Sequence, residues 1–78
     1  MVAYPNPTGS ELRVELPAQQ KGATKLALLD AAGRRVLSTV TSNKQQLLDV
    51  RRLPDGIYTL QATLPNGKVL TQKVVVSR

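Results

Sequence analysis

The side chains that could perform chemistry in this chain are few, and none has a catalytic partner. The 78 residues include no histidine and no cysteine, so an imidazole base, a thiolate nucleophile and the commonest zinc ligands are missing. Without histidine no serine can belong to a Ser-His arrangement; the serines are Ser10, Ser38, Ser42 and Ser77. The acidic residues fall singly in turns or at outward strand positions; they are Glu11, Glu15, Asp30, Asp49 and Asp55. The sequence therefore predicts no enzyme, no metal site and no cofactor.

The positive charge of the chain could serve an acidic partner. Formal net charge is +6, from eleven Lys/Arg against five Asp/Glu, which would suit nucleic acid or anionic lipid. The basic residues are scattered, however, and the two tyrosines, Tyr4 and Tyr58, are the only aromatic side chains for base stacking. No apolar run approaches the roughly 20 residues that span a bilayer. We expect solvating charge, no nucleic-acid partner and no membrane insertion.

The elements that position these side chains are short strands. Runs of alternating apolar residues separated by turn signals predict antiparallel β structure, and no long window has helical periodicity. The expected strands are 2–4, 11–16, 24–30, 35–41, 45–50, 56–64 and 69–76, with a polar connection over 17–23. Residues 1–78 are expected to form a single domain, which at this length buries only about 60% of its unfolded surface.

The alternation also predicts which side chains form the core. The residues expected to face inward are Leu12, Val14, Leu16, Leu26, Leu28, Leu48, Val50, Tyr58, Leu60, Ala62 and Leu64. Most strands then have one buried and one solvated face, which is typical of two sheets packed together. The predicted fold is an all-β, small immunoglobulin-like antiparallel β-sandwich of about seven strands.

Turn chemistry marks the connections between these strands. Asp30 and Gly33 predict a tight hairpin, and the Asn66-Gly67 pair predicts a type I′ hairpin before the last strand. Leu53, Pro54, Asp55 and Gly56 predict a corner, at which the missing side chain of Gly56 permits the bend. Tyr58 is expected to send its hydroxyl back to upstream backbone and so fix that corner. The loop Pro5-Asn6-Pro7-Thr8-Gly9 is interpreted as a turn that sets the exit of the first strand, rather than as a recognised surface.

Four of these segments together resemble a known family. They are Tyr4-Pro5-Asn6-Pro7, Asp30-Ala31-Ala32-Gly33-Arg34, Leu53-Pro54-Asp55-Gly56-Ile57-Tyr58 and Lys73-Val74-Val75. In this order and spacing the chain is similar, over essentially its whole length, to the type A C-terminal sorting domain of substrates of the type IX (Por) secretion system. Two departures are Leu29, where an aromatic residue often precedes the hairpin Asp, and an ending in Ser77-Arg78 instead of lysine.

The resemblance implies a function and a set of partners. A cargo protein fused upstream would cross the inner membrane of a Bacteroidota-type cell by its own signal and wait folded in the periplasm. The outer-membrane translocon and its shuttle proteins would recognise this domain and deliver the cargo to the cell surface or the extracellular space. A sortase-like peptidase would then cleave upstream of the domain, and an anionic lipopolysaccharide is a possible acceptor for the cargo.

The last strand carries the candidate recognition residues: Lys73, Val74, Val75, Val76, Ser77 and Arg78. Our hypothesis is that the terminal hairpin, residues 60–78, presents an edge to which a receptor strand adds. The motivating feature is the run of three valines on an expected edge strand, where natural proteins usually place protection. In the alternative interpretation Val74 and Val76 fill the core. Lys73 and Arg78 could steer the domain to an acidic receptor surface.

A different function is a fibronectin-like or carbohydrate-binding accessory module of an extracellular enzyme. Such a module needs an exposed aromatic platform. The chain has no Trp or Phe, Tyr4 stands at a strand end and Tyr58 at the corner, so this alternative is the weaker one.

Overall fold

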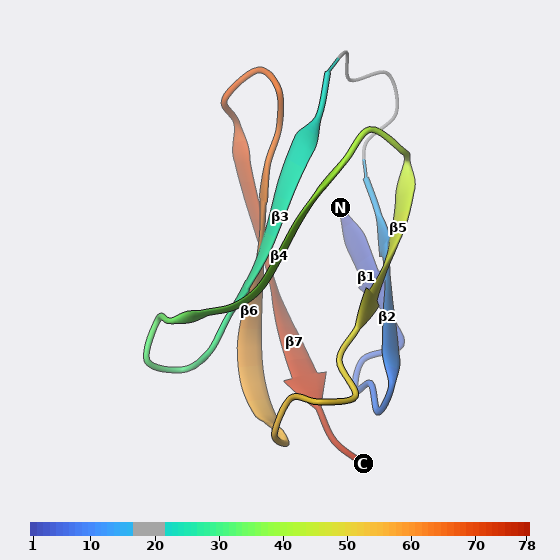
Figure 1. The fold of residues 1–78 in the computed structure, drawn as a ribbon, viewed down its shortest axis with the longest axis vertical. Coiled ribbons are helices and arrows are strands. Elements are labelled where there is room, and N and C mark those ends of the chain that lie inside the picture. Colours follow the sequence, from blue (N-terminus) through green and yellow to red (C-terminus); the bar gives the residue numbers. More distant parts are fainter. Residues whose placement is uncertain (17–21) are drawn as a thin grey trace.

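Seven strands form two antiparallel sheets in the computed structural model, which describes residues 1–16 and 22–78 (Figure 1). The strands are β1 (Val2–Tyr4), β2 (Glu11–Glu15), β3 (Thr24–Leu29), β4 (Arg35–Thr41), β5 (Gln45–Asp49), β6 (Gly56–Thr63) and β7 (Val69–Val76). Every expected strand is present with its ends within one residue of the prediction, and the described ranges contain no helix. The all-β sandwich is confirmed. The polar connection expected over 17–23 lies mostly outside the described residues.

The two sheets form two layers. One has three strands in the order β1-β2-β5, and the other has four in the order β4-β3-β6-β7. All pairings inside the sheets are antiparallel. Figure 1 shows the four-stranded layer on one side and β1, β2 and β5 on the other. Strands β4 and β7 are therefore the two outer strands of the larger sheet.

The core lies between the layers and is almost wholly aliphatic. Its buried members are Ala3, Leu12, Val14, Leu26, Leu28, Leu48, Val50, Tyr58, Leu60, Ala62, Val74 and Val76. Leu64 is also buried, whereas Leu16, expected to face inward, is only partly buried beside the core. Because alternate side chains point to opposite faces of a strand, the predicted period of two correctly buries every residue expected to face inward except Leu16.

Both tight hairpins have the same geometry. At the first, Gly33 N donates to Asp30 O and Asp30 N donates to Arg34 O; at the second, Gly67 N donates to Leu64 O and Leu64 N to Lys68 O. Gly33 and Gly67 have φ of 84° and 89°, which disfavours other residues. The second loop thus has three residues between Leu64 and Lys68 and is not the two-residue type I′ turn expected from Asn66-Gly67. Pro65 explains the difference, because its fixed φ suits the second position of an ordinary turn.

The predicted corner is present. The Tyr58 hydroxyl donates to Pro54 O at 2.6 Å, and the ring is buried. Leu53 N donates to Val50 O, and the Leu53 side chain packs against the core. A Cβ at Gly56 would lie 3.8 Å from Tyr58 Cε1, an ordinary contact, so the bend does not depend on the missing side chain.

Candidate recognition surface

The loop between β1 and β2 covers the outer edge of β7. The Asn6 amide Nδ2 donates to Lys73 O at 3.1 Å, and its Oδ1 accepts a hydrogen bond from Val75 N at 2.9 Å. Two residues on, Thr8 N donates to Val75 O and Ser77 N donates to Thr8 O. Asn6 and Thr8 thus satisfy the outward backbone groups along the last third of β7, as a neighbouring strand would.

The covering loop is itself held in place. Thr8 is 1% exposed, and its hydroxyl donates to Glu11 O at 2.6 Å. The Gln72 side chain makes a further connection from β7 to the N-terminal strand, donating to Ala3 O at 3.1 Å. The loop was predicted only as a turn. No local pattern in the sequence could reveal that Asn6 bonds to backbone 67 and 69 residues away.

The three valines of β7 face in different directions. Val74 and Val76 are 0% and 1% exposed, so the interpretation that they fill the core holds for these two side chains. Val75 is partly exposed on the outer face of the sheet, directly opposite Ile57 of β6, which is 55% exposed. Ile57 and Val75 form an apolar pair at the end of the terminal hairpin. Of this pair only Val75 was among the candidate recognition residues.

The C-terminal arginine is engaged by the corner. Arg78 donates through its guanidinium to Val50 O, Leu53 O and Asp55 Oδ1. The Arg78–Asp55 ion pair is 3.0 Å long. Arg78 therefore holds the chain end against the corner before β6, whereas the side chains of Lys73 and Ser77 are exposed.

The sequence matches the model of a known protein family. Residues 2–77 match the model of the secretion system C-terminal sorting domain. The chain belongs to this family. Its members are the C-terminal sorting signals of type IX secretion, so the domain directs export to the cell surface or the extracellular space. No curated protein matches the chain.

The family is one of sorting signals and not of catalysts, and its members engage the type IX secretion system. Within residues 1–16 and 22–78 no three acidic side chains gather into a group that could hold a metal ion. The same residues contain no helix long and apolar enough to cross a membrane. An accessory carbohydrate-binding function is not favoured.

The two sheets of the sorting domain carry opposite charge. Strands β3, β4, β6 and β7 contain no acidic residue, and their cations are Lys25, Arg35 and Lys73. In the smaller sheet β2 and β5 supply Glu11, Glu15 and Asp49 against one Arg13. The charged residues on the strands of the larger sheet are thus all basic.

Three titratable side chains have pKa values shifted by their surroundings: Asp30, Asp49 and Tyr4. Asp30 accepts hydrogen bonds from Arg34 N and Ala32 N, and Arg34 Nε lies 2.9 Å from its Oδ2. These contacts, that of the Arg34 N–H first, hold the pKa of Asp30 below its usual value. Hydrogen bonds from Arg51 likewise lower the pKa of Asp49. Burial, and then the hydrogen bond from its hydroxyl to Glu15, raise the pKa of Tyr4.

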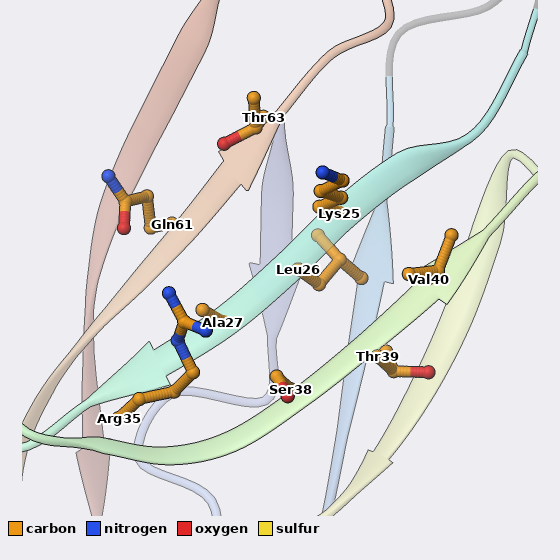
Figure 2. A pocket seen from close by; sticks show the side chains of 9 residues that line it. All are labelled: Lys25, Leu26, Ala27, Arg35, Ser38, Thr39, Val40, Gln61 and Thr63. Atoms are coloured by element: carbon orange, nitrogen blue, oxygen red, sulfur yellow. The ribbon is translucent and has the colours of Figure 1, made fainter.

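A shallow groove crosses the outer face of the larger sheet. Its volume is about 360 Å³, and residues of β3, β4 and β6 line it. Figure 2 shows the small Ala27 at its centre, Lys25 on β3, and Arg35 extending from β4 toward Ala27. Gln61 and Thr63 of β6 form the opposite side. The groove has basic and hydroxyl or amide side chains and no acidic ones.

Proposed function

We propose that the outer-membrane type IX translocon and its shuttle proteins recognise the sorting domain through the outer face of the terminal hairpin. Residues 1–78 then act as one address for a cargo domain fused upstream. The cargo crosses the inner membrane by its own signal and waits in the periplasm with this domain folded. After export a sortase-like peptidase cleaves upstream of the domain, as the family resemblance implies.

The observation that carries this proposal is the apolar pair of the exposed Ile57 and the partly exposed Val75. Exposed aliphatic side chains side by side on a small domain are candidates for a partner contact, since burying them stabilises a complex. Lys73 lies two residues from Val75 on the same face and adds a positive charge that would attract an acidic receptor surface.

For residues 73–77 we propose recognition through the outer face of β7 in place of strand addition to its edge. Their outward backbone groups already bond to Asn6 and Thr8, so strand addition there would require the N-terminal loop to leave. Val74 and Val76 would act indirectly, by packing in the core and fixing the position of Val75 between them.

The test is secretion of a reporter fused ahead of residues 1–78 in a type IX-competent cell. Deleting residues 70–78 would not serve, because the deletion also removes Val74 and Val76 from the core. The sharper variant is Ile57→Thr with Val75→Thr, because threonine keeps the β-branched shape and removes apolar surface. We expect surface delivery to fall about tenfold, the effect of losing roughly 1.4 kcal/mol of binding.

The matched control is Val2→Thr with Val36→Thr, two valines that are 55% and 38% exposed and lie outside the terminal hairpin. The control should be delivered at the wild-type level, and all three proteins should unfold at similar denaturant concentrations. Wild-type delivery of the Ile57/Val75 variant would contradict the proposed surface. If the Ile57/Val75 variant stays in the periplasm and keeps the mass of the uncleaved fusion, then cleavage depends on export.

A further inference from the structure

We infer that the open edge of β4, together with the groove beside it, is a docking site for an acidic, extended peptide segment. This inference goes beyond the sorting function proposed above. It concerns β4, which lies at the opposite edge of the sheet from β7. The segment would add to β4 as a fifth strand and place carboxylates over the basic groove.

The first argument is the unpaired edge. β4 is the outermost strand of its sheet and, in the described part of the chain, pairs on one side only, with β3. Leu37, Thr39 and Thr41 turn their side chains inward, and Thr39 and Thr41 stand opposite Leu26 and Thr24 of β3. Val75 turns its N–H and C=O away from β6, and the antiparallel registers carry this alternation across the sheet, so the N–H and C=O groups of Ser38 and Val40 point away from β3. A peptide strand offers the donors and acceptors that these groups need.

The second argument is the groove that adjoins this edge. Val40 is 61% exposed, and its side chain and that of Ser38 border the groove from β4. A strand added to β4 would direct every second side chain over this face, at intervals of roughly 7 Å. Lys25 and Arg35 would then stand within reach of successive side chains of the added strand (Figure 2).

The third argument is charge, which selects the occupant. No acidic residue stands on any strand of this sheet, and Lys25 and Arg35 make no ion pair within the described residues. A second copy is a poor occupant, because two-fold pairing of β4 with β4 would bring each copy's Lys25 and Arg35 toward the same cations of the other. An anionic lipid headgroup would neutralise the cations but offers no regular alternation of donors and acceptors to pair with the outward backbone groups of Ser38 and Val40. An acidic strand satisfies both the backbone and the charges.

The experiment titrates the complete 78-residue chain, labelled with ¹⁵N, with a seven-residue peptide of alternating threonine and glutamate. Amide signals of Ser38, Val40 and Ala27 should shift together. The same peptide with glutamine in place of glutamate should bind roughly tenfold more weakly, and raising the salt concentration to about 1 M should remove most of that difference.

Two variants separate charge from backbone pairing. Lys25→Gln with Arg35→Gln should weaken binding roughly tenfold, whereas Lys44→Gln with Lys68→Gln, which removes equal charge at two turns, should leave it nearly unchanged. Ser38→Pro removes an outward N–H without breaking a bond to β3 and should abolish the shifts at Val40. Ser38→Ala is the control for the side chain, and an unchanged spectrum away from β4 shows that each variant is folded.

Four results would overturn the inference. They are equal binding of the glutamine peptide, shifts confined to β7 or to the smaller sheet, concentration-dependent dimerisation that perturbs β4 without peptide, and binding of anionic phospholipid vesicles at β4 when the peptide does not bind. None of these results bears on reporter secretion by the Ile57/Val75 variant, so failure here is distinguishable from failure of the proposed function.

Discussion

The outer edges of β7 and β4, the two outer strands of the larger sheet, differ in whether another segment covers them. On β7 the N-terminal loop supplies a substitute for a neighbouring strand, through Asn6 and Thr8. On β4 nothing in the described residues takes this place, and the strand carries Ser38 and Val40 beside a basic groove. An exposed edge is a liability in a small β protein, because it can pair with any extended chain. Among residues 1–16 and 22–78, one such edge is covered and the other is open.

The closed edge joins the two ends of the sequence. Residues 6–8 bond to residues 73–77, so the order of the terminal strand depends on the loop between β1 and β2. The two strands also differ in the core, since β7 contributes the fully buried Val74 and Val76, whereas β4 contributes the partly buried Leu37. β7 is built into the fold at both its edge and its inner face, while β4 is attached mainly through β3.

The largest expected effect tests this difference in the core. Val74→Ala removes two fully buried carbons and should lower the free energy of unfolding by about 2 kcal/mol, a transfer contribution plus the cost of the cavity. Leu37→Ala removes more atoms but from a partly exposed site, and we expect a loss of about 1 kcal/mol. Urea denaturation followed by circular dichroism measures both. A larger loss for Leu37→Ala would contradict the unequal roles of the two strands.

A second prediction concerns hydrogen exchange at the two edges. Asn6→Ala removes two hydrogen bonds and should cost about 1 kcal/mol of stability. It should also raise the exchange rate of the Val75 amide by tenfold or more, because that N–H loses its acceptor. The amides of Ser38 and Val40 should exchange rapidly in wild type and variant alike.

Asn66→Ala is the matched control for this measurement. Asn66 Oδ1 accepts a hydrogen bond from Lys68 N in the distant hairpin, so its loss should leave the Val75 amide protected. Slow amide exchange at Ser38 and Val40 in the wild type would show that the β4 edge is covered. It would then contradict the proposed difference between the edges of β4 and β7.

The parts of this fold that could be read from the sequence are those with a local cause. Alternating apolar residues place Leu12, Val14, Leu60 and Ala62 inward because the strand period is two, and the structure buries all four. The Tyr58 hydroxyl reaches Pro54, four residues away, so the corner was also predictable. The prediction from local spacing was wrong at the second hairpin, where Pro65 favours a different turn from the type I′ turn expected for Asn66-Gly67.

The parts that the sequence could not reveal depend on contacts between distant segments. Asn6 in a Pro-Asn-Pro loop has all the features of an ordinary turn residue, and its role requires the C-terminal strand to lie beside it. The alternation that turns Tyr58 inward leaves Ile57 on the other face of the strand, but the pairing of Ile57 with Val75 follows from the register of β6 and β7. The groove likewise exists because β3, β4 and β6 align Ala27 with larger neighbours.

The smallest expected effect concerns acid and the start of β4. The pKa of Asp30 is lowered in the folded protein, so its carboxylate contributes stability that is fully present above the unfolded pKa, about 4, and is lost as the pH falls through the folded pKa. Because Asp30 holds the hairpin that leads into β4, acid below pH 4 should raise amide exchange at Leu37 and Thr39 before it does so at Val74.

Asp30→Asn should remove this part of the pH dependence, since asparagine does not titrate. Asp49→Asn is the control, because Asp49 also has a lowered pKa but lies in β5. If Asp49→Asn abolishes the acid sensitivity of β4 and Asp30→Asn does not, the open edge is loosened by the smaller sheet and not by its own hairpin.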